Sequence, residues 1–572
     1  MWGHSEIKGQ LAIIEGEKSP DIIITNADYL HSIYKKWMKG NIWISGDRIV
    51  YVGQAMPAVT EGAEIFDASG KKIVPGYIEP HAHPFQLYNP RTFANYAAER
   101  GTTTMISDNL AFFLTLDDIT SFSIMDELST LPFSFYWWGR FDSQTATENE
   151  ATLFNVDSIR RWAGRPDVLL GGELTGWPRL MNGDPDMFSF LQAVKAEGKK
   201  IEGHFPGASE RTLARMRLLG VDGDHEAMTI EEVETRLLHG YGVTLRHSSI
   251  RPDLPDLLKA LVEKELDVFD HLMMTTDGSS PSFYIDGVMD KCIRIALDAG
   301  VEPIDAYQMV TYNIARYYNM TDLHGLIATG RYASLNILDD ADHPVPTDVL
   351  SKGEWVKREG RLAEPFPSIN WSDFGVFAPD FELKESDLRF DQPIGIEMVN
   401  DVITKPFQIT RDTTAAQLEN GHDESFLMLI DRHGKWHVNT VIKGFATDVQ
   451  GFASTYSNTG DILLLGKDKQ EMVRAFEEVK RIGGGMALVE NGEIIQTLPL
   501  IIGGGFSKEP MDLLMAQELE LKKALVDRGF KYGDAIFSLQ FLQTTHLPYV
   551  RITPLGIYDV MKNEVLIPVK ER

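Results

Sequence analysis

The sequence predicts an α/β protein: a (β/α)8 barrel, a small β-sandwich domain built from the segments that flank the barrel, and a C-terminal α/β domain. Two observations predict the barrel. Apolar, strand-like runs recur at intervals of about 20 to 35 residues between residues 75 and 320, and a helical pattern follows each run. That interval is the repeat of a βα unit, and eight such units close a barrel.

The predicted elements follow in order along the chain. Residues 20–74 contain short β-branched runs broken by Gly and Asp, and residues 321–366 return to the same texture, so we expect them to form one split β domain. Residues 75–320 form the predicted barrel. Its predicted strands are Ile73–Ile78, Thr103–Ser107, Phe133–Trp138, Val168–Gly171, Lys200–Gly203, Leu219–Val221, Val243–Arg246 and Val268–Met274.

A linker rich in Pro and Asp, residues 367–392, separates the barrel from the C-terminal α/β domain, residues 393–572. The domain alternates strands and helices. Two segments have apolar residues at helical spacing and two are apolar strand-like runs. These are the helices Lys469–Arg481 and Pro510–Asp527 and the strands Phe426–Ile430 and Ile462–Leu465.

Composition narrows the class of protein. The 572 residues leave room for two to four domains, and 83 acidic against 55 basic side chains give a formal charge of −28. Nucleic acid and anionic membranes repel such a polyanion, so neither is an expected partner. The single cysteine, Cys292, excludes a disulfide framework and a Cys-rich zinc site. The sequence has no signal-peptide pattern and no apolar run of membrane-spanning length, so we expect a cytoplasmic protein.

A His-x-His pair marks the end of the first predicted barrel strand, in the run Val74-Pro-Gly-Tyr-Ile-Glu-Pro-His81-Ala-His83. Side chains alternate along a strand, so both imidazoles lie on one side and can reach one cation. Barrel chemistry takes place at the carboxyl ends of the strands, which favours a metal pair over two ordinary loop histidines.

Further candidate ligands follow other predicted strands: Glu173, His204, His225 and Asp277. With His81 and His83 they supply four imidazoles and two carboxylates, enough for two divalent cations. A sulfur-free set of this kind suits Mn²⁺, Fe²⁺ or Zn²⁺. Two cations that share a carboxylate lower the pKa of a water between them, and an Asp beside that water can take its proton. The residues therefore predict metal-assisted hydrolysis.

Three other residues are candidates for binding substrate. Arg246 and His247 end the seventh predicted strand, and either substrate contact or a structural ion pair would explain them. Ser279 follows Asp277 and could donate a hydrogen bond to a substrate, although serines are also common in turns.

The chain resembles the amidohydrolase superfamily and, within it, the adenine deaminases. The motifs Gly101-Thr-Thr-Thr and His81-x-His83 are those of the superfamily, whereas three features resemble the adenine deaminase branch. These are Gly203-His204-Phe-Pro-Gly207, Asp224-His225-Glu226 and a C-terminal region with Lys443-Gly444-Phe445, Ile482-Gly-Gly-Gly-Met486 and Leu498-Pro-Leu-Ile-Ile502. The resemblance runs from about residue 20 to the end of the chain.

The resemblance implies a role for each ligand. His81 and His83 would bind one metal, His204 and His225 the other, Glu173 would bridge the two, and Asp277 would bind metal and carry the proton. It further implies two Mn²⁺ or Fe²⁺ ions and attack of metal-bridged hydroxide on C6 of adenine, giving hypoxanthine and ammonia, in purine salvage or catabolism. A homo-oligomer, dimeric or larger, would be usual.

The chain departs from the adenine deaminase pattern around this core. Asp108-Asn109-Leu110-Ala111 replaces the usual Asp-Pro-His-Glu after the second strand. Pro84-Phe85-Gln86-Leu87 replaces Ile-Glu-Ser-Ser, and Thr455-Tyr456-Ser457-Asn458-Thr459 replaces His-Asp-Ser-His-Asn. The predicted metal ligands are thus intact, while parts of the shell around them differ.

Two alternatives stay open. A cyclic-amide hydrolase of the same superfamily often bridges its metals with a carboxylated lysine, but the segment around Glu173 offers no lysine. A purine-binding homologue with impaired catalysis would keep the barrel without turnover.

Overall fold

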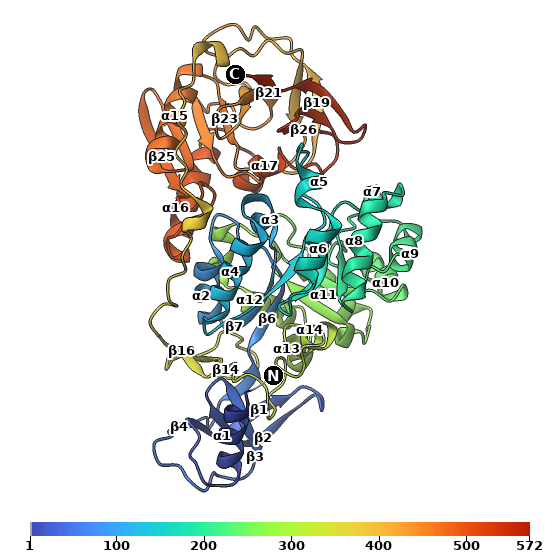
Figure 1. Ribbon diagram of the computed structural model, residues 1–572, viewed down its shortest axis with the longest axis vertical. Coiled ribbons are helices and arrows are strands. Elements are labelled where there is room, and N and C mark those ends of the chain that lie inside the picture. The colour runs from blue at the N-terminus through green and yellow to red at the C-terminus, as the bar shows by residue number, and fades with distance from the viewer. Residues whose placement is uncertain (1–2) are drawn as a thin grey trace.

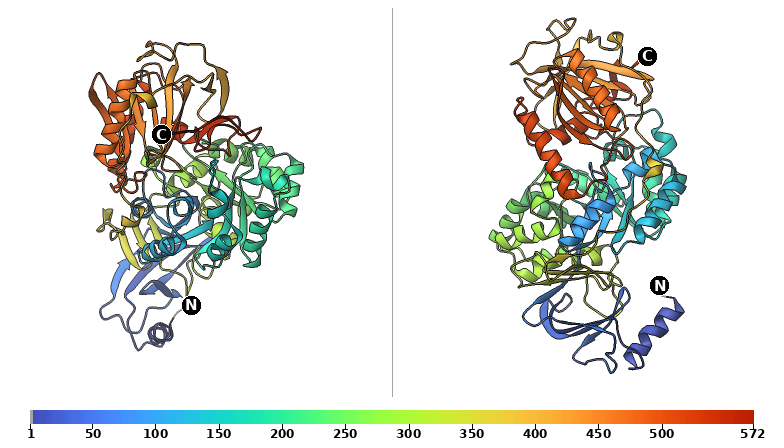
Figure 2. Two further views of the ribbon diagram at one scale, coloured as in Figure 1. Left: turned by 45° about the horizontal axis from the view of Figure 1, so that its top comes forward. Right: turned by 90° about the vertical axis from the view of Figure 1, so that its left-hand side faces the viewer.

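The structure is a computed structural model that describes residues 3–572. The described chain forms a sheet domain, a barrel and a C-terminal domain, arranged one after another along the long axis (Figure 1). The barrel lies between the other two, and both views in Figure 2 show the C-terminal domain at one end of the barrel and the first sheet at the other. The predicted α/β class is confirmed.

The barrel sheet consists of parallel strands joined in sequence order. They are β6 (Tyr77–Ala82), β7 (Thr102–Ser107), β8 (Ser134–Gly139), β9 (Val168–Leu174), β10 (Lys200–Gly203), β11 (Gly223–Asp224), β12 (Gly242–Arg246) and β13 (Leu272–Thr275). Because parallel strands end at the same edge, their carboxyl ends converge.

Three predicted strands need correction. The run Ile73–Ile78 is divided between β5 (Lys72–Pro75), which belongs to the other sheet, and β6. The sixth strand is the short β11 and not Leu219–Val221, because its residues are Gly and Asp and so lack an apolar run that a pattern can detect. The eighth strand begins at Leu272, since a 3-10 turn, η1 (Phe269–His271), precedes it.

A buried carboxylate links β6 to β13. Glu79 lies on β6 and accepts hydrogen bonds from the backbone N–H of Thr276 at 2.8 Å and from the hydroxyls of Thr275 and Thr276. Backbone hydrogen bonds also join both strands to the segment that contains Met309 and Val310. Ile78 on β6 donates its N–H to Val310 O, and Met274 on β13 donates its N–H to Met309 O. Side-chain and loop contacts therefore hold together β6, which carries His81, and β13, which precedes Asp277.

Helices surround the barrel sheet (Figure 1). In chain order they are α2 (Pro90–Glu99), α3 (Leu110–Thr115), α4 (Asp118–Ser129), α5 (Glu150–Leu153), α6 (Val156–Ala163), α7 (Trp177–Met181), α8 (Pro185–Ala196), α9 (Glu210–Leu218), α10 (Ile230–Leu238), α11 (Leu254–Glu263), η2 (Pro281–Asp286), α12 (Met289–Asp298), α13 (Pro303–Gln308) and α14 (Tyr312–Tyr317).

The first sheet is assembled from both flanks of the barrel. Hydrogen bonds join β5 to the later β14 in antiparallel register, so the chain returns to this sheet after it leaves the barrel. The members are β1 (Ile22–His31), β2 (Lys36–Ser45), β3 (Arg48–Gly53), β4 (Glu64–Asp67), β5, β14 (Leu335–Leu338), β15 (Asp348–Ser351), β16 (Glu354–Arg358) and β17 (Arg361–Leu362). A helix that the sequence patterns did not predict, α1 (His4–Ile14), precedes it. The domain boundaries drawn from the sequence stay a prediction.

The C-terminal domain has its own mixed sheet and a smaller three-stranded sheet within the described residues. The predicted helices correspond to α15 (Lys469–Ile482) and α16 (Met511–Val526), and the predicted strands to β20 (Glu424–Ile430) and β23 (Ile462–Gly466). The strands are β18 (Ile394–Met398), β19 (Thr404–Gln408), β20 (Glu424–Ile430), β21 (Trp436–Lys443), β22 (Gly451–Ser454), β23 (Ile462–Gly466), β24 (Gly485–Glu490), β25 (Glu493–Pro499), β26 (Val550–Thr553), β27 (Gly556–Asp559), β28 (Glu564–Pro568) and β29 (Lys570–Glu571), with a third helix, α17 (Ala535–Phe541).

Polar contacts fasten this domain to the barrel at the loop that follows β13. Lys522 on α16 lies 2.6 Å from Glu518 and 2.9 Å from Asp534, and it donates to the Ser280 hydroxyl at 2.7 Å. Glu518 in turn accepts the backbone N–H of Ser282 at 2.6 Å. Glu518 and Asp534 are buried, so the pairing with Lys522 compensates charges that water does not reach.

Asp461, at the start of β23, provides a test of the C-terminal core. Burial raises its pKa from 3.8 to about 7, with Asp431 adding to the rise. A carboxyl whose pKa is higher in the folded state contributes its full stability below pH 4, and that stability is lost as the pH rises through about 7. Asp461→Asn should therefore increase the free energy of unfolding at pH 8 by on the order of 2 to 4 kcal/mol, which raises the melting temperature. At pH 4 it should have little effect.

Differential scanning calorimetry at the two pH values measures this effect. Asp380→Asn, at an exposed position, is the matched control and should change neither transition. A lower melting temperature for Asp461→Asn at pH 8 would contradict the assigned burial.

No helix within residues 3–572 combines the length and the apolar character needed to cross a bilayer.

Candidate metal centre

The carboxyl ends of the barrel strands bring polar side chains to one place. β6 carries His81 and is followed by His83, and β9 carries Glu173. Other strands end next to a polar residue: Asp108 follows β7, Arg140 follows β8, His204 follows β10, His225 follows β11, Arg246 ends β12, and Asp277 lies two residues after β13. All six predicted metal ligands therefore come from this edge of the barrel.

The first group of ligands consists of His81, His83 and Asp277, whose ligand atoms lie within 4.8 Å of one another. His83 Nε2 is 3.2 Å and His81 Nε2 is 4.0 Å from Asp277 Oδ1. His83 Nδ1 lies 2.9 Å from Asp108 Oδ2, so the carboxylate holds the ring with Nε2 facing Asp277. Sequence reasoning mentioned Asp108 only as part of a departure from the family pattern.

The second group consists of Glu173, His204 and His225. Glu173 Oε1 contacts His204 Nδ1 and lies 3.4 Å from His225 Nε2. The two groups meet, because His225 Nε2 is 3.8 Å from Asp277 Oδ2 and the rings of His81 and His225 are 4.0 Å apart. The predicted ligands thus form one continuous cluster with Glu173 and Asp277 on its two sides.

The donor set fits divalent cations. His81 Nε2, His204 Nδ1 and His225 Nε2 are buried and make no well-aligned hydrogen bond within the described part of the chain, and the groups that face them are the carboxylates of Glu173 and Asp277. An unpaired ring nitrogen in a buried site is unfavourable unless a ligand takes it up. Imidazole nitrogens with carboxylate oxygens and no sulfur match Mn²⁺, Fe²⁺ or Zn²⁺.

Two buried arginines set the charge of the carboxylates. Burial disfavours the charged form of Glu173, but His204 and Arg140, whose Nη1 is 3.1 Å from Glu173 Oε2, hold its pKa well below its usual range. Burial likewise opposes ionisation of Asp277, whereas Arg246, 3.0 Å from Oδ2, and His83 hold its pKa well below normal. Both carboxylates are therefore charged at neutral pH, as cation ligands must be.

The ring of His83 competes with cations for a proton. Burial lowers its pKa, but the hydrogen bonds to Asp108 and Asp277 outweigh burial and raise the pKa to about 9. A cation bound at Nε2 would have to displace this proton, so the site would hold cations more weakly as the pH falls.

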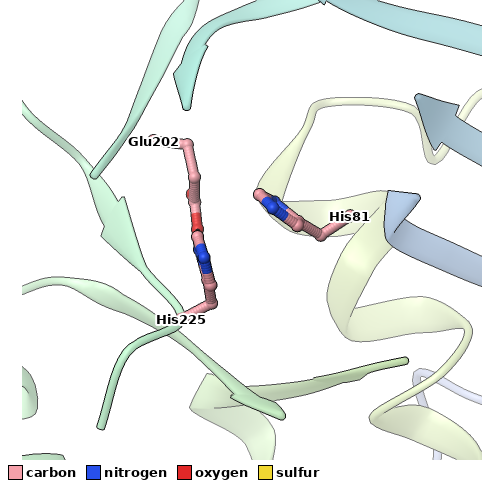
Figure 3. A group of neighbouring side chains, drawn as sticks. All are labelled: His81, Glu202 and His225. Atoms are coloured by element: carbon pink, nitrogen blue, oxygen red, sulfur yellow. The ribbon is translucent and has the colours of Figure 1, made fainter. Parts of the chain in front are cut away.

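Glu202 is a polar residue of the centre that sequence reasoning missed. It lies on β10, and its Oε1 is 3.3 Å from His225 Nδ1. Figure 3 shows the side chains of Glu202 and His225 pointing toward each other, with His81 approaching from the opposite strand. Burial raises the pKa of Glu202 to about 7. Its spacing of two residues before His204 places both on the same side of the strand, which is the signal that could have found it.

Arg140 and Glu226 were also missed. Arg140 follows an apolar strand directly and binds Asp108 through two nitrogens, at 2.7 and 2.8 Å. Glu226 lies 3.4 Å from His225 Nε2 and contacts Arg246 and Arg251. Burial opposes the charge on Glu226, but His204 and the two arginines lower its pKa to about 2. The sequence signal that could have identified Arg140 is a charged residue directly after a strand. For Glu226 it is a charged residue directly after a candidate ligand.

Only one of the three predicted substrate residues is found at the cavity. Arg246 lines the cavity at the metal centre, but neither His247 nor Ser279 is among the described residues that do so. The His247 ring packs 5.3 Å from Phe283, and burial together with Lys291 lowers its pKa to about 4. The Ser279 hydroxyl donates to Thr276 O inside its own loop, at 2.9 Å.

The C-terminal domain forms the far wall of the cavity. The cavity has a volume of about 700 Å³, and its lining includes the predicted ligands His83, Glu173, His204 and Asp277. The opposite wall comes from the C-terminal domain: Tyr456, Asn458, Phe506, Gln540, Phe541 and His546. The ring of His546 lies 5.6 Å from that of the predicted ligand His204.

A family profile identifies the class of protein to which the chain belongs. The profile described as "Amidohydrolase family" matches residues 73–357, which include the barrel strands and their ligands. The chain is thus an amidohydrolase, a class to which hydrolases of C–N bonds belong. A second profile, "Adenine deaminase C-terminal domain", matches residues 401–564, the part of the chain that closes the cavity.

The relatives identify the branch: the chain belongs to the adenine deaminase family. It is 51% identical over 99% of its length to a Halalkalibacterium halodurans protein named "Putative adenine deaminase", of which it covers 98%. A Bacillus subtilis protein with the same description is 47% identical, with 99% and 98% covered. A Cenarchaeum symbiosum protein named "Adenine deaminase" is 30% identical, with 97% and 94% covered.

Among solved structures, the β-aspartyl dipeptidase of Fervidobacterium islandicum is similar to this chain at 17% identity and a TM-score of 0.47. The match covers 60% of this chain and 98% of the dipeptidase.

Proposed function

We propose that the protein catalyses the hydrolytic deamination of adenine or a related aminopurine, which gives hypoxanthine and ammonia from adenine and water. The observation that carries the proposal is the cluster of four imidazoles and two carboxylates inside a cavity whose other wall is the adenine deaminase C-terminal domain. The names of the relatives agree with this reaction.

The predicted ligands would hold two divalent cations. His81 and His83 would bind one, His204 and His225 the other, with Glu173 between them and Asp277 beside the first. Such cations, Mn²⁺ or Fe²⁺ by preference and Zn²⁺ as an option, lower the pKa of water so that hydroxide is available near neutral pH. The buried ring nitrogens of His81, His204 and His225, which face carboxylates without a well-aligned hydrogen bond, support this assignment.

Asp277 would move the proton. As the water oxygen bonds to C6 of the ring, the carboxylate accepts a proton from the water and returns it to the amine, which leaves as ammonia when the C6–N bond breaks. Arg246, in contact with Asp277 Oδ2, keeps the carboxylate ionised and so ready to accept that proton. Arg246 also lines the cavity and would contact the substrate, whereas substrate roles for His247 and Ser279 stay predictions.

An ammonia-release assay tests the proposal. Protein purified with Mn²⁺ or Fe²⁺ should contain about two metal equivalents per chain and release hypoxanthine and ammonia in equal amounts from adenine. Protein with no bound metal would refute the reaction class. Bound metal without ammonia from any aminopurine would refute the substrate class.

The same proposal gives the protein a biological setting. A deaminase for a free purine would serve purine salvage or catabolism in the cytoplasm, and a homo-oligomer would be its working form. The predicted boundaries, with domains at 20–74 plus 321–366, at 75–320 and at 393–572 and a linker at 367–392, belong to this proposal too.

A further inference from the structure

Two segments that depart from the adenine deaminase pattern meet at the cavity, although they lie 370 residues apart. One is the turn after the His-x-His pair, which contains Gln86. The other is the loop after β22, which contains Tyr456 and Asn458. All three residues line the cavity. The contact joins the barrel to the C-terminal domain beside the metal centre.

A chain of hydrogen bonds connects these side chains. The Tyr456 hydroxyl donates to Gln86 Oε1 and lies 3.3 Å from Gln540 Oε1. Gln540 Nε2 donates to Asn458 Oδ1 at 3.0 Å. Tyr456 is only 4% exposed, and burial raises its pKa well above the usual range, so it remains a neutral donor. A buried hydroxyl with fixed partners holds the amide of Gln86 in one orientation.

That orientation directs the Gln86 amide nitrogen toward the centre. With Oε1 bound to Tyr456, Nε2 is left as a donor, and it makes no hydrogen bond within residues 3–572. It lies next to Gly278, the residue after Asp277: a Cβ at Gly278 would be 3.4 Å from Gln86 Nε2 and 3.1 Å from His83. An uncharged donor thus stands near His83 and Gly278, with no hydrogen-bond partner among the described residues.

We propose that Gln86 is a substrate-contact residue, donating through Nε2 to a ring nitrogen of the purine, and that Tyr456 of the C-terminal domain is its positioning residue. This inference rests on the proposed function. A neutral amide suits a neutral heteroaromatic ring, because it pairs with a ring nitrogen and leaves no buried charge unpaired. The C-terminal domain would thereby take part in substrate recognition through Tyr456.

Binding measurements on the metal-loaded full chain, made in the Asp277→Asn background so that adenine is not consumed, test the contact. The probes are adenine and its 1-deaza, 3-deaza and 7-deaza analogues, each of which lacks one ring nitrogen. Gln86→Met keeps the length of the side chain and removes the donor. It should weaken adenine binding about tenfold and leave the affinity for one of the three analogues unchanged. Metal content should stay at the wild-type value.

Tyr456→Phe removes the positioning hydroxyl. It should raise KM for adenine about threefold to tenfold with kcat changed far less, and it should have little further effect in the background of Gln86→Met, because both changes break one interaction. Tyr549→Phe, at an exposed tyrosine of the same domain, is the matched control and should behave as wild type.

The outcomes separate the two proposals. Equal weakening of all four ligands by Gln86→Met would indicate a packing role and overturn the contact. Unchanged adenine binding in that variant, with a wild type that turns adenine over, would overturn the contact and leave the proposed function standing. A metal-loaded wild type that binds none of the four purines would overturn both.

Discussion

Replacing Asp277 by asparagine is expected to lower turnover by about 10³-fold or more while the fold and most of the metal are retained. The amide keeps an oxygen for a cation but has no charge with which to accept a proton. Asp277 has a φ of +51°, in the left-handed region that Asn tolerates as well as Asp, so the backbone of the loop should not change. Ammonia release per bound metal, with metal measured by elemental analysis, is the readout.

Asp286→Asn, exposed on the same loop, serves as the matched control for Asp277→Asn. Its turnover should equal that of the wild type. A rate for Asp277→Asn within a few-fold of the wild type, at equal metal content, would refute the proton-transfer role.

His204→Ala is expected to lower the metal content from about two equivalents to about one and to remove nearly all turnover. His204 Nδ1 contacts Glu173 Oε1, and its loss leaves the second group with His225 and Glu173 as the remaining ligands. The first group, around His83 and Asp277, should keep its cation. Elemental analysis after removal of loosely bound metal measures the change.

The exposed His343 provides the comparison, since His343→Ala should retain both equivalents. Circular dichroism of both variants checks that the fold is intact. If His204→Ala itself fails to fold, His204→Asn preserves a polar group there and should show the same metal loss. Full occupancy in a folded His204 variant would contradict its assignment as a ligand.

The spacing of strands and polar residues allowed the barrel and the cluster of ligands to be predicted. His81, His83, Glu173, His204, His225 and Asp277 each stand at or just beyond a strand end, and the barrel turns that linear order into proximity. The sixth strand was misplaced because β11 has two residues and no apolar run, yet His225, which follows it, was still recognised as a candidate ligand.

The partners of the ligands could not be predicted in the same way. Asp108 and Arg140 act on His83 and Glu173 through contacts between neighbouring strands, and their pairing depends on side-chain geometry. The cavity wall from the C-terminal domain depends on how two domains dock, and the contact between Gln86 and Tyr456 spans 370 residues. A local sequence pattern carries no information about contacts between residues that lie so far apart along the chain.

The division of the cavity between two domains has a consequence for evolution. Every predicted cation ligand belongs to the barrel, whereas Tyr456, Gln540 and His546 reach the same cavity from a domain with a separate sheet. Mutations in the C-terminal domain can therefore alter which molecule is accepted without disturbing the hydrolytic apparatus. Related proteins can in this way share one hydrolytic reaction and differ in the substrates that they accept.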